Sequence, residues 1–454
     1  MGNYTRKQWL TLIVFCIAQF CNAVCVSLQA PFYPHEAEMK GATATQYSFV
    51  FAVFELVVFT VCPIYGQFLE RIGVNFMNNA GIFTVSVSCI LFGFLNRMSG
   101  PTVFLTFSFI IRIIEALGNA AFITTAFSII AQEFPLNVAS AFATLETFFG
   151  LGLIAGPTVG GALYELGGFT LPFVVLGCVL MVAAAMVWYF LPVEGSLNRP
   201  TSRYSVFSLL RKPKIFLFAF TTMSGSISVG FLFSTLEPHI RPLNLTPLEI
   251  GLIFVLNGFA YAVSAPIWGR LCDRCLPERA ATTMGALTVT VAFLMLGPSP
   301  ILPIKNSLPL CICALVIHGL GFGAQFVATF SGTQKDAVEA GLPDDLTTYG
   351  LVSGLWNSSF ALGAFIGPSI AGVMFDTIGF GWGTSIIALL HLLVAIVTIF
   401  LSCYYRYYPD EDLSERTSLL QRSARGSESA DSTYGSGCNS TRVSREDIAI
   451  VTVD

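Results

Sequence analysis

The sequence predicts an all-α membrane protein in which twelve transmembrane helices form two pseudo-symmetric six-helix bundles. Of its 454 residues, 54% are hydrophobic and only 11% are charged, whereas a soluble domain carries about 25% charged residues. An internal repeat is the second observation. The segment from Gly156 to Phe169 returns about half a chain later, from Gly367 to Phe380, with five identical positions. Such a period in apolar sequence is typical of secondary transporters, whose two similar bundles face each other.

Twelve apolar runs are long enough to cross a membrane, since about 20 residues of helix span the hydrocarbon core. They cover roughly residues 8–30, 47–66, 77–96, 102–127, 139–164, 170–191, 214–238, 247–268, 280–297, 307–333, 346–374 and 382–404. Their length and continuity favour helices over a β-barrel. The first run has the length of a signal peptide, but it lacks a clear small-residue cleavage site. We therefore expect it to be the first span.

The Lys and Arg residues predict the orientation. An even number of spans puts both termini on one side, and most of the cations fall on that side. The opposite side keeps only Lys40, Arg97, Arg241 and Lys305. Because positive charge favours the cytosolic side, we expect both termini in the cytosol. The sequence has no stripe of basic residues that would indicate binding to nucleic acid.

The chain divides into four parts by composition. We expect a first bundle at 1–192, a cytosolic linker at 193–213, a second bundle at 214–404 and a disordered cytosolic tail at 405–454. The tail is rich in polar residues and has no apolar periodicity. Within it, Glu415, Leu419 and Leu420 have the ExxxLL spacing of an acidic dileucine sorting signal, which sorting adaptors would bind. Such short patterns also arise by chance.

The cysteines and other reactive residues do not form a metal or catalytic site in the sequence. Most of the twelve cysteines lie within spans, where a thiol behaves as a small apolar side chain. Cys272 and Cys275 form a lone CxxC pair without further ligands, so we expect no metal. Because no nucleophile–base set stands out, we do not expect an enzyme. We expect no cofactor either, because a proton gradient would supply the energy for transport.

A short charged element recurs at the predicted cytosolic end of two helix pairs. Gly66, Glu70 and Arg71 in the first half correspond to Gly269, Asp273 and Arg274 in the second. The glycine permits close helix approach. A carboxylate and a guanidinium at a helix end can pair with each other and with helix termini. We expect a latch that forms and breaks as the halves move; alternatively, these loop charges merely set the topology.

The repeated segment itself contains small residues and a proline. Its members are Gly156, Pro157, Gly160 and Gly161 in the first copy, and Gly367, Pro368 and Gly372 in the second. Small residues allow close helix contact, and proline kinks a span. We expect this helix of each half to line the interface between the halves and to take part in gating. The alternative is that these residues only allow tight helix packing. The two roles are compatible, since a gating helix must also pack tightly.

Carboxyl groups within the predicted spans include Glu55, Glu115, Glu146 and Glu237, and the cation Arg112 lies among them. An ionisable group at bilayer depth is costly unless it is paired or hydrated, so each is a candidate functional residue. Arg112 and Glu115, three apart on one helix, can face each other as a structural pair or within the site. The other three acids then lack a positive partner, which protons or a cationic substrate would supply. Glu237 could instead be a loop acid that reaches the lumenal surface.

Polar and aromatic residues add further candidates for the substrate site. Asn22 in span one, and Trp356 with Asn357 in span eleven, could line a cavity through hydrogen bonds and a face that stacks on a cation. His318, midway along span ten, is another titratable group. For each of them, packing within a bundle is the alternative.

With these elements in place, the chain resembles the major facilitator superfamily, and within it the vesicular amine transporters, over almost all of residues 10–404. The GxxxER and GxxxDR elements are common to the superfamily and imply its fold. The more specific matches are Leu236-Glu237-Pro238, Arg112 with Gly118, and Tyr349-Gly350 leading to Gly367-Pro368. The resemblance implies a proton/organic-cation antiporter that loads acidic compartments from the cytosol.

The departures from the monoamine carriers within this family concern the charged residues. Asn22 and Asn357 stand where those carriers have aspartates, and Glu55, Glu115 and Glu146 do not belong to their pattern. Within this family, the chain most resembles the branch of vesicular polyamine transporters. A polyamine has several separated ammonium groups, which suit carboxylates spread over several spans.

We therefore expect a proton-driven antiporter that imports polyamines such as spermidine and spermine into acidic vesicles. It would act as a monomer in the bilayer of secretory, synaptic-type or endolysosomal vesicles. One alternative is a broader organic-cation or drug exporter. Another is an anion carrier anchored by Arg112, which the surplus of acids disfavours. A third is a non-transporting sensor that signals through its tail.

Overall fold

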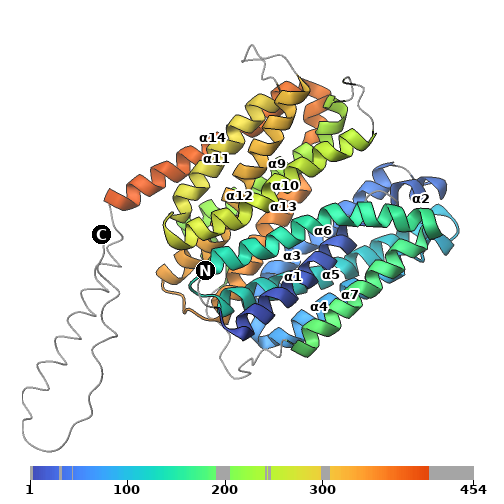
Figure 1. The fold of residues 1–454 in the computed structure, drawn as a ribbon, viewed down its shortest axis with the longest axis horizontal. Coiled ribbons are helices and arrows are strands. Elements are labelled where there is room, and N and C mark those ends of the chain that lie inside the picture. Colours follow the sequence, from blue (N-terminus) through green and yellow to red (C-terminus); the bar gives the residue numbers. More distant parts are fainter. Residues whose placement is uncertain are drawn as a thin grey trace, which may run out of the picture. The chain divides into compact units, whose positions relative to one another are not determined.

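The computed structural model describes residues 4–29, 33–42, 44–190, 205–240, 243, 247–297 and 307–407, and nearly all of them are helical (Figure 1). The long helices of the first half are α1 (Arg6–Ser27), α3 (Ala44–Ile72), α4 (Val74–Phe92), α5 (Pro101–Glu133), α6 (Val138–Gly167) and α7 (Thr170–Phe190). Those of the second half are α9 (Pro213–Ile240), α10 (Pro247–Arg274), α11 (Glu278–Leu296), α12 (Leu308–Glu339), α13 (Leu346–Ile378) and α14 (Phe380–Tyr407). Shorter helical pieces are α2 (Tyr33–Met39), η1 (Leu95–Arg97) and α8 (Val206–Leu210).

Local sequence explains several of the helix boundaries. α1 begins with a capping box, in which the Thr5 hydroxyl accepts from the Gln8 backbone N–H and the Gln8 side chain accepts from the Thr5 backbone N–H. Gly73, with φ 96°, separates α3 from α4, and Gly168, with φ 68°, follows α6. Because other residues rarely adopt positive φ, these glycines let consecutive helices reverse direction within one or two residues.

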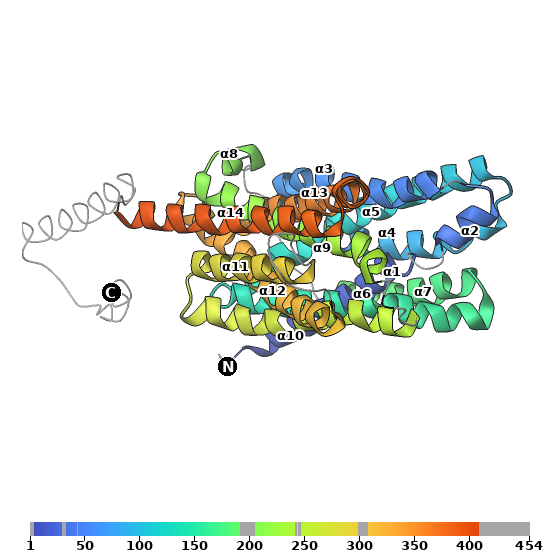
Figure 2. The same ribbon diagram turned by 90° about the horizontal axis from the view of Figure 1, so that it is seen from above.

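The helices of residues 4–400 pack in two sets that follow chain order. α1 packs against α6 and α7, and α4 against α5 and α7; α9 packs against α12 and α13, and α12 against α10 and α11. The two sets meet mainly where α3 lies beside α13 and α6 beside α10 (Figures 1 and 2). The residues of α14 from Leu401 onward belong to a separate unit and are described only as helix.

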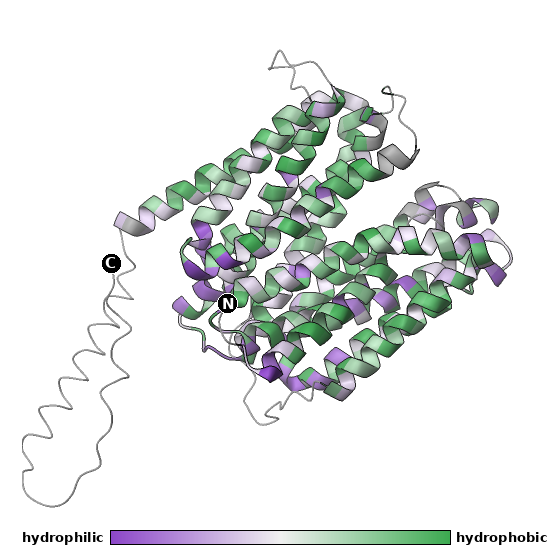
Figure 3. Ribbon diagram, viewed as in Figure 1, coloured by the Kyte–Doolittle hydropathy of each residue, from purple (hydrophilic) through white to green (hydrophobic). Residues whose placement is uncertain are grey.

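Twelve of these helices are long and apolar enough to cross a membrane, which confirms the predicted fold class. Hydrophobic residues dominate along their lengths, and hydrophilic residues gather toward the helix ends (Figure 3). Several helices are longer than the predicted spans; α5, for example, has 33 residues. The predicted loop after the first span contains α2, and the end of the predicted linker contains α8. The sorting residues Glu415, Leu419 and Leu420 lie outside the described residues.

Consecutive spans alternate in direction, which defines two sides of the helical assembly. We call the side on which α1 begins the amino-terminal side, and the other the opposite side. On the amino-terminal side α3 and α10 end, whereas α6 and α13 begin. The sequence predicts that this side faces the cytosol.

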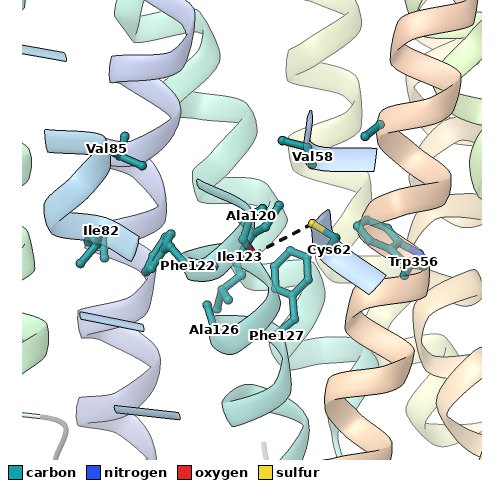
Figure 4. Packing of buried hydrophobic residues seen from close by; sticks show 14 of the residues in the cluster. Val58, Cys62, Ile82, Val85, Ala120, Phe122, Ile123, Ala126, Phe127 and Trp356 are labelled. Carbon is teal, nitrogen blue, oxygen red and sulfur yellow. Dashed lines mark hydrogen bonds between the residues drawn. The ribbon is translucent and has the colours of Figure 1, made fainter. Parts of the chain in front are cut away.

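A buried apolar core continues from the first set of helices into the second. Cys62 of α3 lies between α5 and α13, and its thiol donates to the carbonyl oxygen of Ala120 at 4.0 Å. The ring of Phe127 lies 5.7 Å from that of Trp356, centroid to centroid. Figure 4 shows these side chains in one cluster. The two halves are therefore in direct contact at this level of the protein.

Candidate substrate and gating site

Arg112 and Glu115 form the predicted pair inside α5. Nη1 of Arg112 lies 3.0 Å from Oε2 of Glu115, and the two side chains are 4% and 0% exposed. Gln29, which follows α1, donates its side-chain amide to both carboxylate oxygens, at 2.8 and 3.1 Å. The negative charge of Glu115 is thus compensated within the protein. Gln29 is a partner that the sequence did not indicate.

Arg112 also faces α3. Its guanidinium carbon lies 4.1 Å from the centre of the Phe54 ring and 5.9 Å from that of Phe51, contacts that stabilise a cation away from water. Glu55, next to Phe54, is half-buried and has Arg112 as a charged neighbour. Among the described residues, none donates a hydrogen bond to Glu55. Its carboxyl group, unlike that of Glu115, therefore has no hydrogen-bond donor in the part of the chain that the structure describes.

Glu146 lies in α6, in the half of this helix that is nearer the amino-terminal side. It is 4% exposed. The hydroxyl of Tyr261, on α10 in the other half of the protein, donates a hydrogen bond to its Oε2 at 3.2 Å. In the part of the chain that the structure describes, no cation pairs with Glu146. The local sequence around Tyr261 does not predict this contact.

Asn22 lies in a polar band on α1. Its amide donates to Oδ1 of Asn119 on α5 at 2.9 Å, while its own Oδ1 has no partner among the described residues. Gln19 precedes it by three residues, so that the two share a helix face. Oε1 of Gln19 is also buried without a described partner. Two buried carbonyl oxygens are therefore free to accept hydrogen bonds.

Trp356 and Asn357 are both buried in α13, where they have different environments. The indole N–H of Trp356 donates to the Thr329 hydroxyl at 3.2 Å. The amide of Asn357 donates to the Ser353 carbonyl oxygen, one turn earlier in the same helix, at 2.9 Å. The side-chain amide of Asn357 is thus bonded within its own helix, which agrees with the alternative that Asn357 serves packing within the bundle.

Glu237 lies in α9, close to its end at Ile240. Only its backbone is described, so the predicted role of its carboxyl group stays a prediction.

His318 has both ring nitrogens in hydrogen bonds. Its Nδ1 lies 2.8 Å from the Asn257 amide nitrogen, and its Nε2 lies 3.1 Å from the Ser228 hydroxyl. The Ser228 hydroxyl itself donates to the Gly225 carbonyl oxygen, so it accepts from Nε2–H. A neutral ring satisfies all these contacts, which favours a packing role for His318.

Both predicted gate glycines lie where helices from the two halves cross. A side chain at Gly66 of α3 would overlap the carbonyl oxygen of Gly350 in α13. A Cβ at Gly269 of α10 would lie 2.8 Å from the carbonyl oxygen of Ala139, near the start of α6. Only glycine permits backbones to approach so closely. Both crossings are near the amino-terminal side.

Asp273 bonds to the first turn of α6 across the two halves. Its two carboxylate oxygens accept from the backbone N–H groups of Ala139 and Ser140, at 3.1 and 2.8 Å. Asn137, the N-cap residue of α6, supplies no side-chain cap of its own. A carboxylate at a helix N-terminus satisfies free N–H groups and interacts favourably with the helix dipole. In this conformation Asp273 therefore caps α6 from the other half, and Arg274 is exposed beside it. That this contact acts as a latch stays a prediction.

The corresponding element of the first half does not make the same contact. Glu70 is half-buried and Arg71 is exposed. The start of α13, which Glu70 would reach by symmetry, is capped by the adjacent Asp345, whose side chain accepts from the Thr348 N–H at 3.1 Å. A locally capped helix offers fewer free N–H groups, so the latch is one-sided in this state.

The two copies of the repeated segment pack against the first helix of their own half. A side chain at Gly156 of α6 would overlap Ser27 of α1, and a Cβ at Gly367 of α13 would lie 2.8 Å from the Ile227 carbonyl oxygen of α9. Pro157 and Pro368 lie inside their helices, and Gly160 is buried. Gly161 and Gly372 face open space. These contacts correspond to the tight-packing interpretation; other residues of α6 and α13 form the interface between the halves.

Contacts between the halves gather toward the amino-terminal side. The Ser128 and Ser353 hydroxyls lie 3.2 Å apart, and the Ser358 hydroxyl donates to the Phe59 carbonyl oxygen at 2.7 Å. In Figure 1 the ribbons of α6 and α10 diverge toward the opposite side. The described conformation is closed at the amino-terminal side.

Among the described residues, no His, Cys, Asp and Glu side chains group as metal ligands would.

Comparisons with known proteins give consistent results. The Major Facilitator Superfamily model matches residues 15–342. The human MFS-type transporter SLC18B1 is 38% identical over 387 residues, which cover 85% of this chain and 84% of that protein. The probable vesicular acetylcholine transporter-B of Danio rerio is 24% identical over 435 residues, 93% of this chain and 84% of that protein. The crystal structure of the human organic anion transporter MFSD10 (TETRAN) aligns with a TM-score of 0.69 at 18% identity, covering 87% of this chain and all of that chain, and this likeness concerns the fold.

Replacing Asp273 by Ala should loosen the start of α6. Loss of an N-terminal cap costs about 0.5–2 kcal/mol, so amide deuterium exchange at residues 138–141 should rise several-fold, as measured by mass spectrometry. The matched variant Glu70→Ala should leave exchange at the start of α13 unchanged, because Asp345 caps it. Equal effects of the two variants, or none from Asp273→Ala, would contradict the one-sided latch.

Arg112→Met should destabilise the protein, because it leaves the buried Glu115 carboxylate without its cation. Breaking a buried pair from one side costs about 3–5 kcal/mol, which should lower the thermal midpoint of the detergent-purified protein by several degrees. The double variant Arg112→Met/Glu115→Gln should recover much of this loss. An unchanged midpoint in the single variant would show that Glu115 does not depend on Arg112.

Proposed function

Because the chain belongs to the Major Facilitator Superfamily and is a membrane transporter, we propose that it exchanges protons for small organic cations of the polyamine class, such as spermidine and spermine. The observation that carries this proposal is the imbalance of charge in the spans. Arg112 is engaged by Glu115 at 3.0 Å, while Glu55 and Glu146 have no cation bonded to them among the described residues. A carboxyl group at membrane depth needs a proton or a cation to compensate its charge.

The exchange follows from alternating access of these carboxyl groups to the two sides. When the amino-terminal side is open, ionised carboxylates bind the ammonium groups of the cargo. When the opposite side is open to an acidic interior, protons displace the cargo from the same groups. A difference of one pH unit is worth about 1.4 kcal/mol per proton, so two protons per cycle would concentrate the cargo substantially.

A polyamine suits this arrangement because its charge is distributed along a chain. Glu55, Glu146 and Glu237 belong to α3, α6 and α9, so they are spread over three helices. Separate carboxyl groups can bind separate ammonium groups, and the buried carbonyl oxygens of Gln19 and Asn22 are further acceptors for ammonium N–H groups. One of the similar proteins is named a probable vesicular acetylcholine transporter, and this name supports an amine as cargo. We accordingly place the protein in vesicle membranes with both termini in the cytosol, where the tail could bind sorting adaptors.

The test is uptake of labelled spermidine into proteoliposomes with an acidic interior. We expect uptake that collapses when the pH gradient is dissipated, and that falls at least tenfold in Glu55→Gln and in Glu237→Gln, because an amide cannot replace a charge partner. Glu38→Gln alters an exposed glutamate and serves as the matched control.

A panel of other amines discriminates the alternatives. Strong competition by bulky aromatic cations, with weak inhibition by spermine, would replace the polyamine assignment by a broader organic-cation or drug exporter. Full uptake by both glutamine variants would reject the assigned carboxyl groups. Absence of flux for every cation would favour a sensor.

A further inference from the structure

Glu146 lies beside a cluster of aromatic rings that joins the two halves. Phe142, one turn before Glu146 on α6, stacks on Phe330 of α12 with 4.2 Å between ring centroids and an interplanar angle of 10°. Its ring also meets the edge of Trp356 of α13 at 5.0 Å. On the other side, Tyr261 packs against Phe322 at 5.2 Å. Phe142 thus lies on the amino-terminal side of Glu146, and the rings of Phe330 and Trp356 that it contacts come from the other half of the protein.

The immediate surroundings of Glu146 belong to the seam between α6 and α10. The Thr147 hydroxyl lies 3.2 Å from the Ala262 carbonyl oxygen. A Cβ at Gly150 would touch the Tyr261 ring at 3.5 Å. The hydrogen bond from Tyr261 to Glu146 therefore exists only while the two helices are together at this level. Separation of the halves on the amino-terminal side must break it.

Breaking this contact would leave a carboxyl group among aromatic faces. A carboxylate can accept about four hydrogen bonds, and Tyr261 supplies one. The rings of Phe142, Phe330 and Trp356, now packed on one another, would become exposed around Glu146. A carboxylate beside aromatic faces is the chemistry that binds alkylammonium groups. The components that close one state are thus those of a cation site in the other state.

We infer that Glu146 binds an ammonium group of the cargo only when the amino-terminal side is open, and that the Tyr261 hydroxyl takes the place of this group when that side closes. This inference rests on the proposed function and adds a role for Tyr261, which is a positioning residue. Glu146 lies about 12 Å along α6 from its first residue, at 1.5 Å per residue. By the same rise per residue, Glu55 lies about 16 Å along α3 from the first residue of that helix, which is on the opposite side of the assembly. Closure would therefore pass the cargo from Glu146 toward Glu55.

Tyr261→Phe tests the inference because it removes the hydroxyl and keeps the ring. We expect spermidine to bind the purified protein about tenfold more tightly in this variant, because one charge-assisted hydrogen bond that competes with the cargo is lost. Turnover in proteoliposomes should fall, since release from Glu146 is no longer assisted. Glu146→Gln should weaken binding at least tenfold. In the double variant, Tyr261→Phe should have no further effect.

Tyr47→Phe is the matched control. It removes a tyrosine hydroxyl that donates to Glu38 at 3.1 Å within one half, and it should leave spermidine affinity unchanged. The inference is overturned if Tyr261→Phe leaves affinity unchanged, if it has the same effect in the Glu146→Gln background, or if Glu146→Gln binds spermidine normally. Absence of spermidine binding by the unmodified protein would instead reject the proposed function, and this inference with it. Deuterium exchange at residues 142–150 and 258–266 gives a readout that does not depend on cargo, and it should rise in Tyr261→Phe.

Discussion

The structure depends on how a few carboxyl groups are compensated inside a low-dielectric assembly. Arg112 is held 3.0 Å from Glu115, and Gln29 completes the bonding of that carboxylate. This arrangement leaves Glu55 beside a guanidinium that is already committed, and among the described residues Glu146 has a neutral hydroxyl as its hydrogen-bond donor. Uncompensated charge at membrane depth is costly, and on the proposed function the remaining acids exchange partners with what crosses the membrane. The same constraint makes a cationic cargo chemically consistent with proton coupling.

The contacts that close the amino-terminal side are of three physical kinds. Glycines at two crossings bring the backbones of the two halves together, Asp273 caps α6 from the other half, and aromatic rings from α6 and α12 stack one turn from Glu146. Separation of the halves would break each of them, and each would re-form without chemical change. A helix cap and a hydrogen bond are individually modest, about 1 kcal/mol each. Modest contacts suit a gate that must open in every cycle.

Much of the fold and part of the site could be predicted from the sequence. Apolar runs predicted the twelve spans, because their length is a local property of the sequence, and the repeat at Gly156 and Gly367 predicted two similar bundles. Spacing along one helix likewise predicted the pair Arg112–Glu115. Contacts across the halves could not be predicted in this way: Tyr261 with Glu146 and Asp273 with Ala139 depend on which helices face each other. The amide of Asn357 is bonded one turn earlier in its own helix, a local contact that agrees with the packing alternative.

The central claim is that protons and an organic cation take turns at the same carboxyl groups. It is tested most directly by recording amine entry and interior pH together in proteoliposomes with an acidic lumen. The account predicts that spermidine added outside raises the interior pH in proportion to the amine that enters, above the rate in protein-free liposomes. Entry of amine without any change in interior pH, or proton efflux that ignores the amine, would contradict it.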